Sequence, residues 1–128
     1  MSETPVTPPE SQKTSSGLEQ NTAALLCYLF TWVTGLIFFL IEKENKYVRF
    51  HAMQAILLGV AIVVIWIILF VVDIVLGQIP ILGGILATLL SIVFWVGSLI
   101  VWILMMVKAY QGEMYKLPII GDIAERNV

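Results

Sequence analysis

Three long apolar blocks constrain this chain more than any other feature of its sequence. They cover residues 23–41, 52–72 and 79–107, and they contain no charged residue over 19, 21 and 29 positions respectively. A helix of about 20 apolar residues, rising about 1.5 Å per residue, crosses a hydrocarbon core about 30 Å thick. The sequence therefore predicts an all-α integral membrane protein, a helical bundle with three transmembrane helices.

The composition leaves little room for any other domain. Of the 128 residues, 59% are hydrophobic and only 12% are charged, so the chain lacks the charged surface of a soluble domain. We expect a disordered N-terminal tail at 1–16, a transmembrane domain at 17–108 with spans at about 17–41, 47–76 and 85–107, and a C-terminal tail at 109–128 along the membrane surface. Asn45 is expected to cap the second helix.

The distribution of basic residues indicates an orientation in the membrane. With three spans, the first loop and the C-terminal part share one side and carry Lys43, Lys46, Arg49, Lys108, Lys116 and Arg126, whereas the other side carries only Lys13. The positive-inside rule then predicts a multi-pass protein of the cytoplasmic membrane, with the N-terminus outside and the first loop and C-terminus in the cytoplasm. A fourth span would divide the basic residues four to three, so the asymmetry favours three spans.

Small side chains recur on one face of each predicted span. Residues four apart share a helical face, and small residues let helix backbones approach closely in a bilayer. We interpret these positions as packing contacts of a bundle or a homo-oligomer: Ala23, Cys27, Thr31 and Gly35 in the first span, Ala55 and Gly59 in the second, and Gly83, Ala87 and Ser91 in the third. The lone cysteine excludes an intrachain disulfide.

The predicted spans contain no ionisable side chain near the middle of the membrane. Proton relays and ion-coupled transporters need ionisable side chains in the middle of their spans, and none occurs there. We also find no catalytic grouping, phosphate-binding loop or metal motif. We therefore expect a protein that is not an enzyme and has no catalytic residue, cofactor or metal site.

Polar residues near the membrane surface are the candidate interaction positions. His51 and Gln54 share a helix face that continues into Ala55 and Gly59. Two interpretations remain open: a polar end to a helix–helix contact, or a ligand or partner site formed with Arg49 and an acidic residue at position 42, 113 or 122. The full candidate set is Arg49, His51, Gln54, Gly112, Pro118, Gly121 and Asp122.

Two motifs carry a resemblance to a known family. The run Tyr-Val-Arg-Phe-His-Ala-Met-Gln-Ala at 47–55 follows Glu-Lys-Glu-Asn, and Lys-Ala-Tyr-Gln-Gly-Glu at 108–113 precedes Leu-Pro-Ile-Ile-Gly-Asp-Ile at 117–123. Over about residues 18–126 the chain resembles small prokaryotic membrane proteins that include the MamF/MmsF-like magnetosome proteins, with a distant similarity to the chloroplast import component Tic-twenty. The magnetosome relatives imply a role in organising a membrane compartment. The import relative implies moving or assembling proteins, and four spans.

The sequence supports two functional hypotheses. The first is a small non-enzymatic membrane protein, surrounded by lipid, that assembles through its helices with itself or with other membrane proteins. Its first loop and C-terminal tail would form the contact surface. The alternative is a component of a protein-translocation or pore-forming complex. A basic footprint for nucleic acid is missing, so nucleic acid is not an expected partner.

Overall fold

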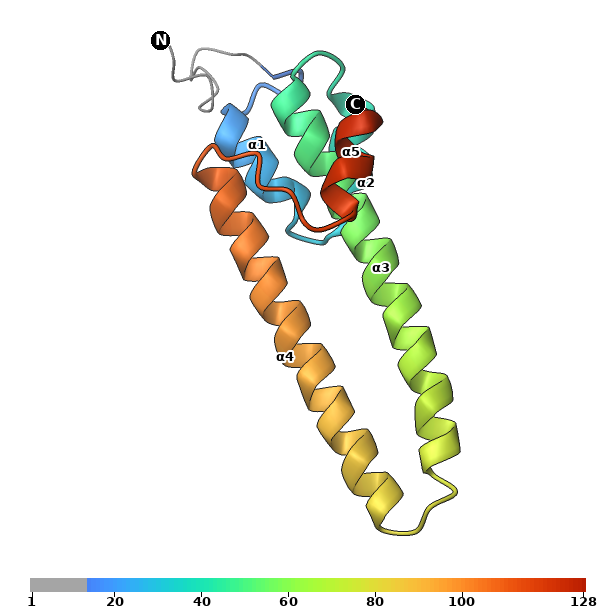
Figure 1. The fold of residues 1–128 in the computed structure, drawn as a ribbon. Coiled ribbons are helices and arrows are strands. Elements are labelled where there is room, and N and C mark those ends of the chain that lie inside the picture. Colours follow the sequence, from blue (N-terminus) through green and yellow to red (C-terminus); the bar gives the residue numbers. More distant parts are fainter. Residues whose placement is uncertain (1–13) are drawn as a thin grey trace.

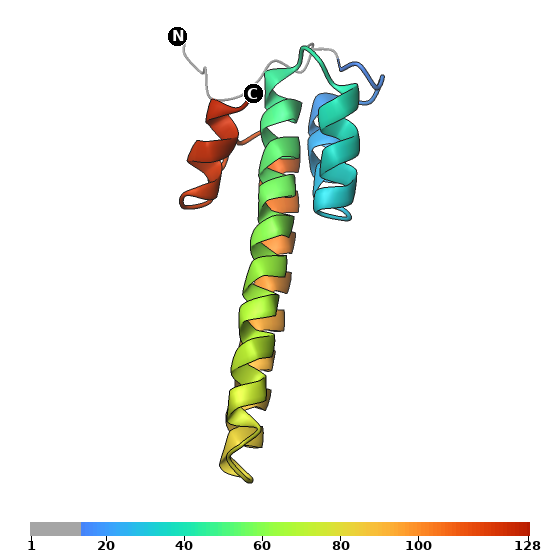
Figure 2. The same ribbon diagram turned by 90° about the vertical axis from the view of Figure 1, so that its right-hand side faces the viewer.

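The computed structural model describes residues 14–128, and the regular structure in that range is helical throughout (Figure 1). The helices are α1 (Gln20–Cys27), α2 (Trp32–Ile41), α3 (Lys46–Leu76), α4 (Leu82–Tyr110) and α5 (Ile120–Arg126). The long helices α3 and α4 run side by side, and the short helices gather at one end of this pair (Figure 2). We call that end, residues 14–59 and 101–128, the head, and residues 60–100 the stem.

Within residues 14–128, two helices, rather than the predicted three, are long and apolar enough to cross a membrane. They are α3 with 31 residues and α4 with 29. The predicted span at 17–41 is instead divided between α1, with 8 residues, and α2, with 10. Helices of those lengths reach about 12 and 15 Å, which is at most half of a hydrocarbon core. The prediction of three transmembrane helices is therefore wrong, because hydropathy is the same whether an apolar helix continues or folds back.

The turn between α1 and α2 is stabilised by side chains that bond its backbone. Thr31 adopts a φ of 48°, which ends the helical path. Thr34 Oγ1 donates to the carbonyl of Cys27 at 3.0 Å, and the indole N–H of Trp102 on α4 donates to the carbonyl of Tyr28 at 2.5 Å. Buried backbone carbonyls need such partners, because no water reaches them.

The fold-back also changes which segments share a side. The hydroxyl of Ser15 donates to the carboxylate of Glu42 at 3.0 Å, and the ammonium of Lys46 donates to the carbonyl of Val128. The first described residues, the α2–α3 loop and the C-terminus therefore all lie at the head. This placement of Ser15 does not fit the predicted separation of the N-terminus from the first loop by the membrane, and the orientation of the chain in a membrane stays a prediction. The first thirteen residues of the predicted tail at 1–16 lie outside the described residues.

Glycines bring α2 close to α3. A Cβ atom on Gly35 would lie 2.9 Å from the carbonyl oxygen of Ala52 and 3.0 Å from the Cβ of Ala55. A Cβ atom on Gly59 would lie 2.7 Å from the Cβ of Trp32. Both glycines therefore sit where any larger side chain would push the two helices apart.

The remaining predicted packing positions are spread over three environments. Ala23 and Cys27 of α1 are fully buried in the core of the head. Gly83 lies in the first turn of α4, where a side chain would collide with the carbonyl of Leu76. Ala87 and Ser91 are half-buried in the stem. The small residues of the third predicted span thus do not form one internal contact.

Candidate functional site

The head encloses a chain of hydrogen bonds among Tyr28, which follows the last residue of α1, and His51 and Gln54 of α3; we call it the polar network. All three side chains are fully buried. His51 Nε2 lies 2.8 Å from the carbonyl oxygen of Glu113, and because a carbonyl only accepts, Nε2 carries the proton. In the neutral ring Nδ1 then accepts from the Tyr28 hydroxyl at 2.8 Å, and that hydroxyl accepts from Gln54 Nε2 at 3.0 Å.

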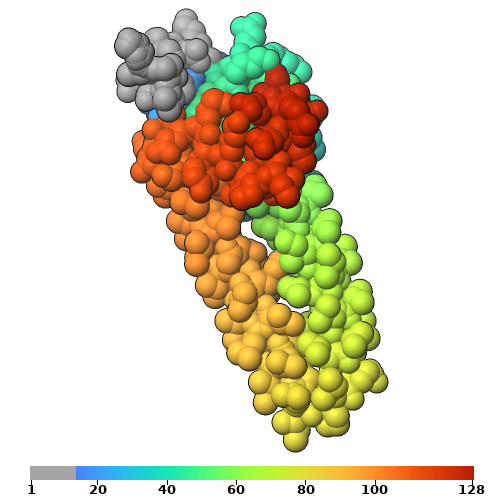
Figure 3. All heavy atoms as spheres, viewed as in Figure 1, coloured from blue at the N-terminus to red at the C-terminus, as the bar shows by residue number. Residues whose placement is uncertain are grey.

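The polar network holds the C-terminal segment by its backbone. Residues 111–119, between α4 and α5, have no regular structure, and we call them the strap. Gln54 Nε2 donates to the carbonyl of Tyr115 at 2.9 Å, and Gln54 Oε1 accepts from the N–H of Leu117 at 2.9 Å. The bonded residues 113, 115 and 117 alternate, as groups on one side of an extended chain do. Figure 3 shows the C-terminal segment lying across the ends of α3 and α4.

Both ends of the strap have constrained geometry. At its start, Gly112 has a φ of 85°, and the hydroxyl of Tyr47 donates to the carbonyl of Ala109 at 2.6 Å. At the start of α5, a Cβ on Gly121 would lie 3.0 Å from Gln54 Oε1 and would collide with Lys116. A glycine is therefore required where α5 rests on the polar network.

A second buried polar group joins α1, the α2–α3 loop and α3. Asn45 caps α3 as predicted, since its Oδ1 accepts from the N–H of Val48 at 3.1 Å, while its Nδ2 donates to Gln20 Oε1 at 2.8 Å. Glu42 accepts from the backbone N–H groups of Asn45 at 3.0 Å and Ser15 at 2.8 Å. Burial raises the pKa of Glu42, but these hydrogen bonds outweigh it and hold the pKa below its ordinary value of 4.5.

Arg49, in α3, forms hydrogen bonds with carbonyl groups at the C-terminus of α2. Its Nη1 donates to the carbonyls of Phe39 at 3.1 Å and Glu42 at 2.6 Å, and the guanidinium lies 4.1 Å from the centre of the Phe39 ring. A cation at a helix C-terminus is favoured by the free carbonyls and the helix dipole. The side chain therefore stabilises the fold-back of α2 onto α3.

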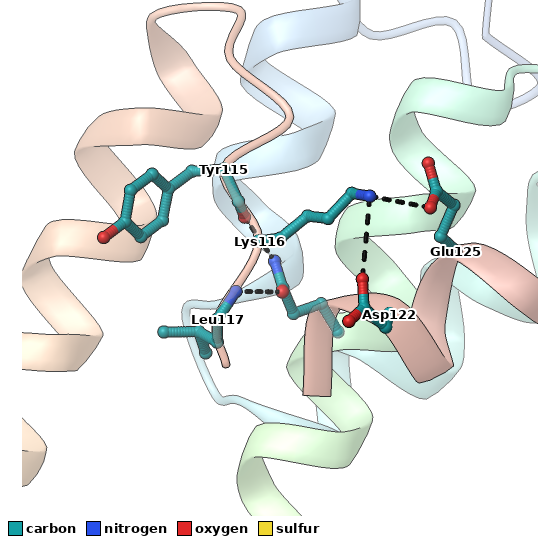
Figure 4. Close-up of polar contacts among 6 residues, drawn as sticks. Tyr115, Lys116, Leu117, Asp122 and Glu125 are labelled. Atoms are coloured by element: carbon teal, nitrogen blue, oxygen red, sulfur yellow. Dashed lines mark hydrogen bonds and ion pairs between the residues drawn. The ribbon is translucent and has the colours of Figure 1, made fainter. Parts of the chain in front are cut away.

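The structure brings only part of the predicted interaction set together. His51, Gln54 and Gly121 meet inside the head, where His51 and Gln54 bind the backbone of the chain's own tail and Gly121 packs against Gln54, so they are not an open contact surface. Asp122 is exposed and lies 3.7 Å from Lys116, which also pairs with Glu125 at 2.7 Å (Figure 4). Three other members lie elsewhere: Arg49 at the end of α2, and Gly112 and Pro118 in the strap.

Sequence reasoning missed Tyr28, Tyr47 and Trp102 as members of the site. Each is an aromatic residue with a polar tip in or beside an apolar block, and each donates to a buried acceptor. The available signal was that a buried Tyr or Trp usually needs an acceptor. That signal predicts a partner but does not identify it.

The polar network is arranged to hold the strap in place. The polar network consists of neutral side chains whose hydrogen bonds are directed at one another and at the strap. Among residues 14–128, no three His, Cys, Asp or Glu side chains gather as metal ligands would. A separate cleft of about 670 Å³ opens beside the α1–α2 turn, and its walls include Phe30, Trp32, Trp95 and Trp102.

Comparisons with known proteins identify relatives over nearly the whole chain. Residues 19–124 match MamF/MmsF, the magnetosome magnetite crystal formation protein family. A UPF0132 membrane protein of Methanocaldococcus jannaschii is 46% identical over 114 residues, which cover 89% of this chain and 93% of the relative. A second from that organism is 44% identical, covering 86% and 71%, and one from Archaeoglobus fulgidus is 37% identical, covering 87% and 97%. No solved structure matches this chain.

Proposed function

This chain belongs to the MamF/MmsF family, and we propose that it is a non-enzymatic membrane protein that acts by assembling through its helices with further copies of itself or with other membrane proteins. Its relatives are membrane proteins, and α3 and α4 are long and apolar enough to span a bilayer. The observation that carries the proposal is a face of small residues on α4 in the stem, which the described chain leaves partly uncovered.

That face consists of Gly84, Ala87, Thr88 and Ser91, which are spaced three and four residues apart and so lie on one side of α4. A Cβ on Gly84 would have no neighbour within 4 Å, and open hollows of about 440 and 470 Å³ adjoin the face. Lipid tails are as apolar as leucine, so helices associate in a bilayer through close backbone approach. A neighbouring helix can make that approach here.

Disulfide trapping in native membranes tests the proposal. In a Cys27→Ala background, Gly84→Cys and Ser91→Cys should each give several-fold more disulfide-linked product than Val93→Cys. Val93 is 69% exposed and lies on another side of α4, so it is the matched control for random collision. Equal and low yields from all three positions would contradict assembly through this face.

The basic residues also support an orientation. In the described chain they all lie outside the stem, at Lys43, Lys46, Arg49, Lys108, Lys116 and Arg126. With two spans, the positive-inside rule places the head in the cytoplasm and the α3–α4 turn outside. A membrane-impermeant thiol reagent applied to intact cells should therefore label Gln78→Cys and leave Lys43→Cys unlabelled, and the reverse pattern would contradict this orientation.

A translocation or pore role would also require assembly, because two spanning helices cannot surround a conduit by themselves. Reconstituted vesicles distinguish the two roles. Assembly without any flux of ions or small solutes supports the first, whereas flux that disappears with the Gly84→Leu variant would support the second. The similarity to Tic-twenty stays a prediction.

A further inference from the structure

We propose that a groove between the α1–α2 hairpin and α4 binds one lipid molecule of the bilayer leaflet that surrounds the head, with a hydrocarbon chain of that lipid lying along it. The hairpin consists of α1, α2 and the turn between them at 28–31, and α1 packs against the head end of α4 (Figure 1). The inference does not depend on the proposed assembly. It rests on the walls, the length and the depth of the groove.

Two hollows that share Trp102 form the groove. The cleft of about 670 Å³ lies beside the turn of the hairpin, and a hollow of about 430 Å³ lies nearer the end of α4, beside Leu25 of α1. One face of α4 runs through both hollows, because its lining residues are spaced four, three, four and four apart. These residues are Trp95, Leu99, Trp102, Met106 and Tyr110.

The groove has the length of one leaflet. The charge-free part of α4 runs from residue 82 to residue 107, and Trp95 stands at its middle, so that end of the groove lies near the middle of the bilayer. Tyr110, at the other end, lies just beyond Lys108, at the depth of the headgroups. At 1.5 Å per residue the helix rises about 22 Å from Trp95 to Tyr110. Half of a bilayer, with its headgroup region, is about 20–22 Å thick.

The two ends of the groove differ as the two ends of a lipid do. Near the middle of the bilayer the walls are aromatic, and Phe30 and Trp32 are 66% and 49% exposed, so a hydrocarbon chain can cover them. At the other end the side chains of Tyr110 and Gln111 are exposed, and within residues 14–128 neither has a hydrogen-bond partner. A phenol and a carboxamide at this depth can donate to the ester or phosphate oxygens of a lipid.

The walls favour a flexible chain over a helix of a neighbouring protein. Helices associate in a bilayer where small residues let their backbones approach, whereas this face of α4 carries large side chains. The walls are also fixed in advance. The indole of Trp102 donates to the carbonyl of Tyr28 at 2.5 Å, and Trp32 packs so closely on Gly59 that no Cβ would fit between them. Binding therefore does not have to order these side chains, which lowers its cost.

Photochemical labelling of the reconstituted protein tests the site. The probe is a phosphatidylglycerol with a diazirine near the end of one acyl chain, present as a trace in vesicles of phosphatidylcholine and phosphatidylglycerol. After illumination, mass spectrometry of peptides locates the label. We expect several-fold more label at Phe30 than at Val93, which lines neither hollow. The two side chains are 66% and 69% exposed, so contact with surrounding lipid alone would label them about equally.

A blocking variant has a matched control one residue away. Leu99→Trp places an indole in the groove, whereas Ile100→Trp places one at a position that lines neither hollow. We expect Leu99→Trp to reduce the label at Phe30 several-fold and Ile100→Trp to leave it unchanged. Equal label at Phe30 and Val93 in the parent protein would overturn the proposal, and this comparison needs no variant to fold. Undiminished label at Phe30 in Leu99→Trp, with unchanged helix content by circular dichroism, would overturn it as well.

Discussion

The head and the stem hold apolar helices together in opposite ways. In the head, small residues bring helices into contact around paired polar side chains, and His51 and Gln54 are fully buried. In the stem, two helices expose large apolar side chains such as Phe70 at 56% and Val93 at 69%. The conformation of the head is therefore specified by contacts within the chain, whereas that of the stem is specified by the surrounding bilayer. Equivalent substitutions in the two regions should have different effects.

Glycine replacement should give the largest difference. Gly35→Leu places a side chain against the backbone of Ala52, which cannot move without separating α2 from α3. We expect a loss of about 3 kcal/mol in the free energy of unfolding, at the upper end for an overpacked core. Gly97→Leu is the matched stem variant, because a Cβ at Gly97 has no neighbour within 4 Å. Denaturant titration in detergent micelles measures both, and equal losses would refute the distinction between the regions.

Removing one member of the polar network should have the next largest effect. Gln54→Met keeps the volume but leaves the carbonyl of Tyr115 and the N–H of Leu117 without their partner. We expect a loss of about 2 kcal/mol and faster protease cleavage within the strap. In the stem, Thr88→Val removes only a bond to the carbonyl of Gly84 in the same helix, and we expect little change. Unchanged cleavage of the strap in Gln54→Met would contradict its anchoring role.

The two tryptophans Trp102 and Trp95 offer a smaller and closely matched contrast. Trp102→Phe loses the hydrogen bond to the carbonyl of Tyr28 that supports the α1–α2 turn, for which we expect a loss of about 1 kcal/mol. Trp95 is 60% exposed and faces the stem surface, so Trp95→Phe should be close to neutral. Thermal unfolding followed by circular dichroism measures both. A larger effect for Trp95→Phe would show that the bilayer-facing surface also specifies the fold.

The sequence predicted the stem better than the head, for a physical reason. Charge-free runs and flanking polar residues mark α3 and α4, because a long helix is the simplest way to satisfy every backbone group in a bilayer. The same rule is met by two short helices when Thr34 and Trp102 bond the turn between them. The partner on Trp102 is 74 residues from Tyr28 and leaves no periodic pattern, so the fold-back of residues 28–31 could not be predicted.

The candidate site was predicted in part. His51 and Gln54 stood out because polar residues next to an apolar block need partners, and the structure gives them partners. Those partners are backbone atoms of Glu113 and Tyr115, and backbone atoms are common to every residue, so they carry no sequence signal. Pattern reasoning therefore locates the polar side chains of such a contact and misses the backbone segment that they bind.

The smallest predicted effect is a dependence on pH at the Glu42 carboxylate in the head. Its pKa is lowered in the folded chain, so its stabilisation is fully present above the unfolded value of 4.5 and is lost as pH falls through the folded value. Glu42→Gln should therefore be less stable than the parent near neutral pH, and the two should converge only when the pH falls below the lowered pKa of the folded chain. Glu44→Gln, at an exposed position in the same loop, is the control and should leave the stability close to that of the parent. Unfolding measured across this range decides the point: a parallel offset of Glu42→Gln that persists in acid would mean that the carboxylate acts by its shape and not by its charge.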